Sequence, residues 1–224
     1  MFDGIARRYD VLNRVLSLQR DQRWRRLAAQ LVLAAHPRTV LDIATGTADL
    51  PLMLTALDPH LRVTGVDIAG EMLARGRAKV RRRGAGGRIA LRQGDALALP
   101  SAPASVDAVT IAFGIRNVAD YRIALREMYR VLRPSGSVTI LEFSLPPHPV
   151  VRLTYLLYFR HLLPVLGGLI SGNPTAYRYL NRSVESFPGA EEFGRLLAAV
   201  GFERIRRLPL TFGIASIYHA RKPA

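Results

Sequence analysis

The chain has 224 residues, of which 49% are hydrophobic, and it contains no cysteine. This length suits one large domain, or one domain with a small lid, and the hydrophobic share is ample for a core. The lack of cysteine excludes disulfides and thiolate metal sites, and the five scattered histidines share no metal-ligand spacing. The first residues lack a basic head followed by an apolar run, so we do not expect secretion.

Positive charge dominates the surface chemistry of this chain. The formal net charge is +15, and only Lys79 and Lys222 among the 32 basic residues are lysines. A field of this sign favours an anionic membrane surface or a nucleic acid as a partner, and charge alone does not decide between them. The sequence motifs distinguish between these two classes of partner.

The N-terminal segment, residues 1–36, has the pattern of basic amphipathic helices. Asp21 is expected to cap a second helix that carries Trp24, Leu27 and Leu31 on its apolar side. The segment suits a lid over a cofactor cleft, a membrane-facing element or a helix docked on the core, and the pattern leaves these alternatives open.

The stretch around Gly46 has the pattern of a nucleotide-binding corner. Residues 40–44 form a short apolar run typical of a buried strand, and Thr45-Gly46-Thr47 then breaks it before a predicted helix. A glycine lets the backbone approach a ligand, and a helix start offers N–H groups to its anionic end. Corners of this kind also occur in α/β proteins that bind nothing there.

An acidic residue at the end of the next strand strengthens this interpretation. The predicted strand 62–68 places Asp67 about 20 positions after the glycine turn, where a carboxylate meets a ribose diol in nucleotide-binding folds. The alternative role for Asp67 is to cap the helix that starts near Ala69, and both roles are compatible. The chain has neither G-x-G-x-x-G nor a P-loop lysine. The D-x-x-x-G pattern from Asp42 to Gly46 instead resembles the cofactor loop of class I S-adenosylmethionine-dependent methyltransferases.

Strands and helices alternate along the rest of the chain, which implies a mostly parallel sheet. Further strands are predicted at 88–93, 106–113 and 137–143, with a closing hairpin at 203–210 and 213–221. Asp95 and Ala96 follow the third strand, where an acid can accept from an adenine amine, or else serve as a turn residue. The loop 114–117 follows the fourth strand, and Asp120 is expected to cap the next helix.

An apolar insertion covers residues 146–188. Arg160, His161 and Pro164 interrupt it well short of the ~20 apolar residues of a membrane span. Its composition is compatible with a pocket for an apolar substrate, with a patch that inserts into a lipid interface, or with an extra helix packed on the core.

Several longer motifs resemble the quinone-biosynthesis C-methyltransferases. They are Tyr9-Asp10-Val11-Leu12-Asn13, Phe113-Gly114-Ile115-Arg116-Asn117, and the segment from Arg130 through Pro134 to Ser144. The resemblance runs over most of the chain. It implies a Rossmann-like class I methyltransferase fold: a seven-stranded, mostly parallel sheet with one antiparallel edge strand, helices on both faces, and a helical lid and insertion. We expect one such domain over residues 1–224.

The resemblance also implies a site. Thr47, Asp67, Asp95 and Ala96 would contact S-adenosylmethionine, and Gly46 and Asp42 of the cofactor loop complete the candidate cofactor residues. Asp21 stands where the family usually has a histidine, so chemistry assigned to that histidine does not transfer to this chain. Methyl transfer to a ring carbon requires a quinol hydroxyl to lose its proton. Our catalytic candidates are Arg116, which would stabilise the phenolate, and Asn117, which would orient it or a bridging water; a turn residue and an ion pair are the structural alternatives.

The resemblance predicts methyl transfer to a polyprenylated quinol, with demethylmenaquinol preferred and a polyprenyl-benzoquinol as the alternative. An RNA methyltransferase is disfavoured because no base-flipping motif follows the fourth strand, so we expect no nucleic-acid partner; a cofactor-binding membrane adaptor without catalysis is the third hypothesis. We expect a cytoplasmic protein, with peripheral attachment to the anionic inner face of the cell membrane as an option. The sequence leaves a homodimer open.

Overall fold

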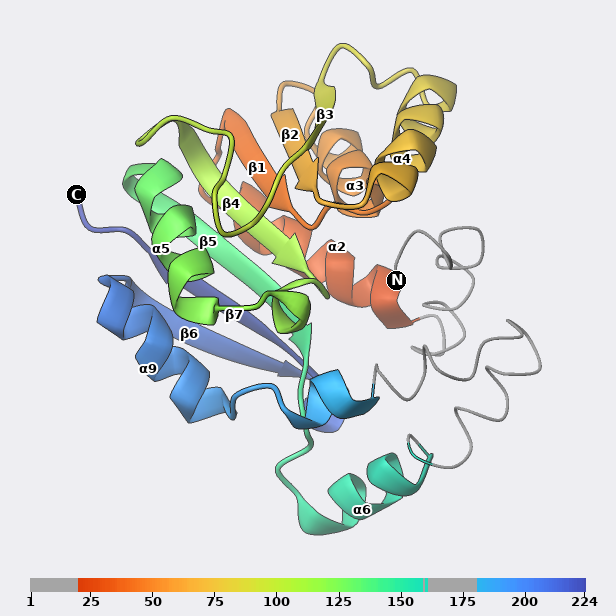
Figure 1. Ribbon diagram of the computed structural model, residues 1–224, viewed down its shortest axis with the longest axis vertical. Coiled ribbons are helices and arrows are strands. Elements are labelled where there is room, and N and C mark those ends of the chain that lie inside the picture. The colour runs from red at the N-terminus through yellow and green to blue at the C-terminus, as the bar shows by residue number, and fades with distance from the viewer. Residues whose placement is uncertain (1–19, 159, 161–180) are drawn as a thin grey trace.

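The computed structural model describes residues 20–158, 160 and 181–224, and its centre is a seven-stranded sheet (Figure 1). The strand order is β3 (Ile89–Gln93), β2 (Arg62–Asp67), β1 (Thr39–Ile43), β4 (Val106–Ala112), β5 (Leu132–Phe143), β7 (Ala215–Arg221) and β6 (Glu203–Leu210). Strands from β3 to β5 pair in parallel, whereas β7 pairs antiparallel with both β5 and β6. The expected mostly parallel sheet is confirmed, with its antiparallel strand one place in from the outermost strand.

Helices cover both faces of this sheet (Figure 1). One face carries α2 (Arg20–Leu33), α3 (Asp49–Leu57) and α4 (Gly70–Arg82), and the other carries α5 (Tyr121–Val131) and α9 (Ala190–Val200). Alternation along the central strands builds both layers: Val40 and Ala108 pack toward α2 and α3, while Leu41 and Val109 pack toward α5 and α9.

Strand order reverses between β1 and β4, so the crevice at their carboxyl ends is the expected ligand position in an open α/β sheet. The chain leaves β5 on that side and continues to α6 (Pro149–Leu157), which lies apart from the sheet in Figure 1. No helix among the described residues is both long and apolar enough to cross a membrane.

Helix α2 is docked on the sheet. Trp24 is buried against Phe113 and Phe143, and its indole N–H donates to the Thr211 hydroxyl at 3.1 Å. Of the three alternatives for the N-terminal segment, the docked helix therefore describes residues 20–33. Residues 1–19 of the predicted lid, with the Tyr9 motif, lie outside the described residues, as do residues 161–180 of the predicted insertion.

Two local predictions were wrong and one was confirmed. Asp21 lies inside the first turn of α2 instead of capping it, and it forms a buried ion pair with Arg25 one turn later. Strand β5 begins at Leu132, five residues before the predicted start, because Leu132 already pairs with Val106 ahead of an irregularity in the ladder. Asp120 caps α5 as predicted, accepting from the backbone N–H groups of Arg122 and Ile123.

Candidate active site

Left-handed backbone conformations open the crevice between β1 and β4. After β1, Ala44, Gly46 and Ala48 have φ values of 51°, 55° and 66°, and Phe113 after β4 has a φ of 60°. Non-glycine residues rarely adopt this region, and such strain gathers at functional sites. The chain thus turns sharply out of both strands.

Gly114 lets these two turns pack against each other. A Cβ at this position would lie 2.4 Å from the Cβ of Ala44, far inside van der Waals contact. Steric contact with Ala44 therefore explains why the predicted loop 114–117 begins with a glycine. The missing side chain allows the turn after β4 to lie close to the turn after β1.

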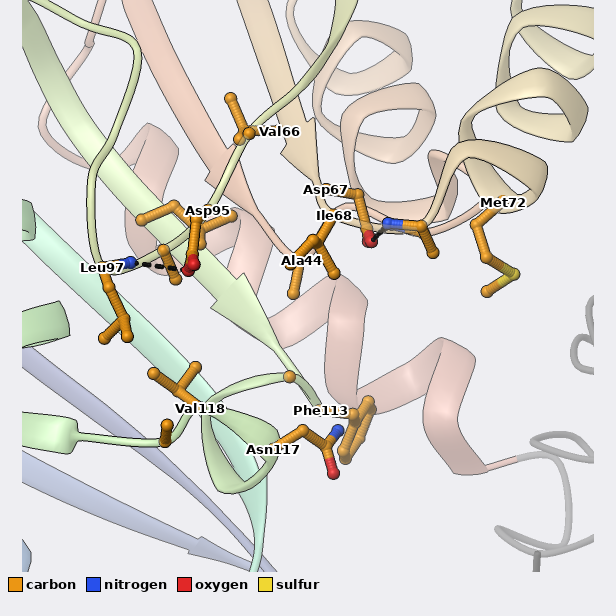
Figure 2. Close-up of a pocket in the computed structure, with 17 residues that line it drawn as sticks. Ala44, Val66, Asp67, Ile68, Met72, Asp95, Leu97, Phe113, Asn117 and Val118 are labelled. Atoms are coloured by element: carbon orange, nitrogen blue, oxygen red, sulfur yellow. Dashed lines mark hydrogen bonds between the residues drawn. The ribbon is translucent and has the colours of Figure 1, made fainter. Parts of the chain in front are cut away.

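A pocket of about 250 Å³ lies in this crevice. Figure 2 shows Asp67, Ile68 and Met72 on one side of it and Asp95, Leu97 and Val118 on the other, with Phe113 and Asn117 at its base. Five of the predicted site residues line it: Gly46, Asp67, Asp95, Ala96 and Asn117. Thr47, Asp42 and Arg116 do not line it.

The Asp67 carboxylate links the ends of β1 and β2. One oxygen accepts from the backbone N–H of Gly46 at 2.7 Å and the other from the N–H of Ala69 at 2.9 Å. The bond to Ala69 is the helix-start role considered from the sequence, and the bond to Gly46 ties the glycine turn to the same group. These two bonds fix the carboxylate at the wall of the pocket.

Asp95 occupies a turn that faces the pocket. Its carboxylate accepts from the Leu97 N–H at 2.9 Å, and its carbonyl accepts from the Ala98 N–H at 3.1 Å (Figure 2). The turn role therefore holds, and the same turn places Ala96 on the pocket wall.

Arg116 points away from the pocket, into the protein. Its guanidinium donates to Glu142 at 2.7 Å and to the Phe113 carbonyl at 2.6 Å, and it lies over the Phe143 ring. Glu142 is fully buried and also accepts from the Phe143 N–H. The ion-pair alternative thus describes the Arg116 side chain, while Asn117 beside it reaches the pocket.

A second, smaller recess lies on the other side of the glycine turn. Its volume is about 30 Å³, and Ala44 and Gly46 line both it and the larger pocket. Asp42, Thr47 and Arg25 line the recess. The amino group of Lys79 donates to the Thr47 hydroxyl at 2.7 Å and to Asp49 at 2.8 Å, which joins α4 to the turn.

Asp42 is a buried carboxylate under the turn. The hydroxyls of Thr45 and Thr110 each donate to it at 2.6 Å. Burial raises the pKa of Asp42 to about 6, against the opposing effect of these bonds and of the Arg25 charge. The ionised form of a buried carboxylate lowers the stability of the folded protein at neutral pH. Such groups are found most often at functional sites, so Asp42 is a functional candidate.

Sequence reasoning missed Arg25, Met72 and Val118 as site residues. Met72 is buried in the first turns of α4 and Val118 ends the loop after β4, so both follow a predicted strand end by a few residues. Their distance from the strand ends could have identified them from the sequence. No such pattern identifies Arg25, because its position depends on how α2 docks on the sheet.

Comparisons with known proteins place the chain among methyltransferases. A family model described as the ubiE/COQ5 methyltransferase family matches residues 1–222. The chain is 51% identical over 223 residues to the demethylmenaquinone methyltransferase of Thermus thermophilus, which covers 100% of each chain. It is 46% identical to the ubiquinone/menaquinone biosynthesis C-methyltransferase UbiE of Geotalea daltonii, over 99% of this chain and 94% of that protein. A solved SAM-dependent methyltransferase from Aquifex aeolicus has the same fold, with a TM-score of 0.60 at 18% identity over 86% of this chain and 88% of that chain.

The raised pKa of Asp42 predicts an unusual effect of its removal on stability. The folded ligand-free protein binds this proton more tightly than the unfolded chain, so the contribution of Asp42 becomes less favourable as the pH rises from about 4 to about 6. We expect Asp42→Asn to increase the free energy of unfolding at pH 7.5 by about 1–3 kcal/mol, at ~1.4 kcal/mol per pKa unit. Urea denaturation at several pH values measures this, and the gain should vanish near pH 4.

Asp107→Asn is the control of opposite sign. Burial alone would raise the pKa of Asp107, but hydrogen bonds from Arg133, Thr39 and Arg38 lower it. Its contribution is therefore present at neutral pH and is lost in acid, so Asp107→Asn should destabilise the protein at pH 7.5. An Asp42→Asn protein that is less stable than wild type at pH 7.5 would contradict the prediction.

Proposed function

The chain belongs to the ubiE/COQ5 methyltransferase family, and we propose that it transfers a methyl group from S-adenosylmethionine to a ring carbon of demethylmenaquinol. A relative that is 51% identical is named a demethylmenaquinone methyltransferase, which favours the naphthoquinol ring. A polyprenyl-benzoquinol is the alternative, since the Geotalea daltonii relative is named for both quinone pathways.

The charge of the pocket is the observation that carries the cofactor assignment. Two aspartates line it, and none of its described lining residues is a lysine or arginine. A pyrophosphate cofactor would meet carboxylates there without a compensating cation, which is unfavourable in a partly buried site. A cationic sulfonium nucleoside suits such a lining. S-adenosylmethionine, when bound, supplies an electrophilic methyl group.

The residues of the pocket then have distinct tasks. Asp67 accepts from the ribose hydroxyls, the turn at Asp95 and Ala96 meets the edge of the adenine, and Ile68, Met72 and Leu97 cover its faces. Phe113 and Asn117 lie at the pocket base, where the quinol ring would approach. Alignment of donor and ring carbon by such walls can supply several kcal/mol, roughly 7–11 at best.

Arg116 is best described as a residue that positions the loop 114–117. Its guanidinium holds the Phe113 carbonyl and the buried Glu142, so its charge is largely neutralised before any quinol binds. Its Nε is buried and has no hydrogen-bond partner among the described residues. Asn117 follows it in the loop and presents its amide to the pocket.

Transfer of a labelled methyl group to a short-chain demethylmenaquinol tests the proposed function. The purified enzyme should form a product one methylene heavier. Asp67→Ala should weaken S-adenosylmethionine binding by about 100-fold or more, because a charge-assisted bond to the ribose and the tie to Gly46 are both lost. Calorimetry measures the affinity, and circular dichroism checks the fold.

Two outcomes would contradict this proposal. Unchanged cofactor affinity in Asp67→Ala would remove the ribose assignment. Transfer to a short-chain benzoquinol at a higher kcat/KM than to the naphthoquinol would select the alternative substrate.

The Arg116–Glu142 pair allows a test of position against chemistry. Arg116→Gln should reduce kcat by about 100-fold and destabilise the fold, since breaking a buried pair costs about 3–5 kcal/mol. The double variant Arg116→Gln/Glu142→Gln removes the unpaired charge and should recover most of the stability. If kcat also recovers, Arg116 acts through the loop alone; if kcat stays low and its pH profile shifts, the guanidinium acts on the quinol oxygen.

We further propose that α6 contacts an anionic lipid surface from which the quinol is drawn. Val150, Leu153 and Leu157 recur on one face of this helix and are 64%, 61% and 52% exposed. Arg152 on the same helix is also exposed, Arg160 just after the helix is exposed and pairs with Glu185 at 2.8 Å, and the net charge of the chain is +15. An amphipathic helix with basic neighbours is typical of an interfacial anchor.

Vesicle sedimentation tests this surface. Leu153→Asp/Leu157→Asp should reduce binding to vesicles with an anionic lipid by about 10-fold and leave methyl transfer to a water-soluble short-chain quinol unchanged. Arg83→Gln, an exposed arginine at the end of α4, is the control for general charge loss. Equal vesicle binding by the double variant and wild type would contradict a role for α6.

A further inference from the structure

A third cavity lies at the amino ends of the strands, away from the crevice. Its volume is about 300 Å³, and its walls are residues 35–38 between α2 and β1 and residues 133–137 of β5. We call this cavity the basal groove. Small-molecule sites begin at about this volume. Five residues of chain separate Thr39, at the start of β1, from Ala44 of the crevice, so the two cavities are roughly 16 Å apart.

An irregularity in β5 builds one wall of the basal groove. The ladder between β4 and β5 shifts register beside Asp107, so residues 133–136 loop out of it. Within this loop Ser135 has a φ of 62°, and His36 on the other wall has a φ of 49°. Left-handed backbone at non-glycine residues is rare and gathers at functional sites, and here it occurs on both walls.

Positive charge dominates the lining of the basal groove. Arg38 and Arg133 both line it and are exposed, and His36 lies with them. The Arg38 guanidinium forms no hydrogen bond or ion pair within the described part of the chain. Arg133 donates to Asp107 through one nitrogen, and a guanidinium has five N–H donors. The groove therefore offers one uncommitted guanidinium and a second that retains free donors.

Asp107 is the acid among the described lining residues, and its carboxylate already has its hydrogen bonds. One oxygen accepts from Arg133. The other accepts from the backbone N–H groups of Arg38 and Thr39, at 3.0 and 2.9 Å, and from the Thr39 hydroxyl at 2.9 Å. Asp107 thus holds the Arg133 fork and the backbone that carries Arg38, so it positions both arginines.

An unsatisfied hydroxyl lies at the floor of the basal groove. Ser137 lines the groove and is 2% exposed, and its Oγ is buried without a hydrogen-bond partner among the residues that the structure describes. Buried polar atoms are nearly always hydrogen-bonded, so an orphaned hydroxyl beside a cavity points to a partner that binds there. A serine hydroxyl donates readily to an oxyanion.

We propose that the basal groove binds a soluble phosphate monoester, with Arg38 and Arg133 pairing with its oxygens and Ser137 donating to it at the floor. Two guanidinium forks and a hydroxyl supply more donors than the two oxygens of a carboxylate need, whereas a phosphate presents three terminal oxygens. Helix α6 lies beyond the carboxyl end of β5, and the groove lies at the amino end of that strand (Figure 1). A phosphate headgroup in a membrane that holds α6 would therefore not reach the groove.

Titration with glycerol 3-phosphate, followed by calorimetry at fixed ionic strength, tests this site. Wild type should bind it, and Arg38→Met/Arg133→Met should bind it about 100-fold more weakly, because two charge-assisted contacts are lost. Arg82→Met/Arg83→Met removes the same charge from two exposed arginines at the end of α4 and should bind as wild type does. Saturating S-adenosylmethionine should not displace the phosphate, because the crevice is a separate site.

Two single variants separate recognition from folding. Arg38→Met breaks no ion pair and should weaken binding by about 10-fold in a protein that melts at the same temperature as wild type. Ser137→Ala removes the unpaired hydroxyl and should weaken binding by about 3- to 10-fold without lowering the melting temperature. Lactate, a carboxylate of similar size with a single charge, should bind wild type about 10-fold more weakly than glycerol 3-phosphate.

Several results would overturn the proposal. Absence of binding by wild type, or equal affinity in wild type and in Arg38→Met/Arg133→Met, would do so. An equal loss in the two double variants would as well, because general positive charge has that signature, and displacement by S-adenosylmethionine would place the phosphate in the crevice. Vesicles that contain phosphatidic acid present the same phosphate group on a lipid. If only these vesicles bind, and binding requires Arg38 and Arg133, the soluble ligand is overturned in favour of a lipid headgroup.

Discussion

The carboxylate of Asp67 joins the parts on which the site depends. It accepts from Gly46 after β1 and from Ala69 before α4, so two neighbouring strand ends are fixed by one side chain. On the other side, Gly114 lets the turn after β4 pack on Ala44. Hydrogen bonds to Asp67 therefore hold one side of the crevice, and close packing of Gly114 on Ala44 holds the other side. The positions of these turns are therefore fixed by the Asp67 bonds and by the close packing at Gly114.

Charges near this crevice are arranged as neutral pairs around aromatic rings. Phe113 and Phe143 lie with ring centres 4.6 Å apart, and each has an arginine over its face, Arg25 and Arg116 respectively. Each arginine is paired with an acid, Asp21 or Glu142. Cation–π contacts gain strength when desolvated, and the paired acids limit the cost of burying the guanidinium groups. An apolar ring that approaches Phe113 and Phe143 would therefore meet these two arginines already paired with acids.

The sequence predicted the strands because their apolar runs are short and end at turn residues. It also predicted Asp67 and Asp95, because parallel strands bring their carboxyl ends to one edge of the sheet. It did not predict the pairing of Arg116 with Glu142, since 26 residues separate them and the contact exists only once β4 and β5 lie side by side. The prediction that Asp21 caps the helix was wrong for a different reason: its partner Arg25 lies one turn along the same helix, and the spacing of four residues was a usable local signal.

Among the described residues, few unpaired positive charges lie at the crevice, although the net charge of the chain is +15. The two arginines beside it are neutralised, Lys79 is shared between Thr47 and Asp49, and the described lining of the larger pocket is acidic. Had the charge served a nucleic-acid substrate, cations would be expected along the path to the cofactor, because phosphate contacts dominate such binding. Many of the described basic residues lie on exposed parts of helices such as α4. The positive electrostatic potential of the protein therefore arises mainly from its exposed surface. At the site itself, the two aspartates of the pocket favour binding of a cationic methyl donor beside a neutral ring.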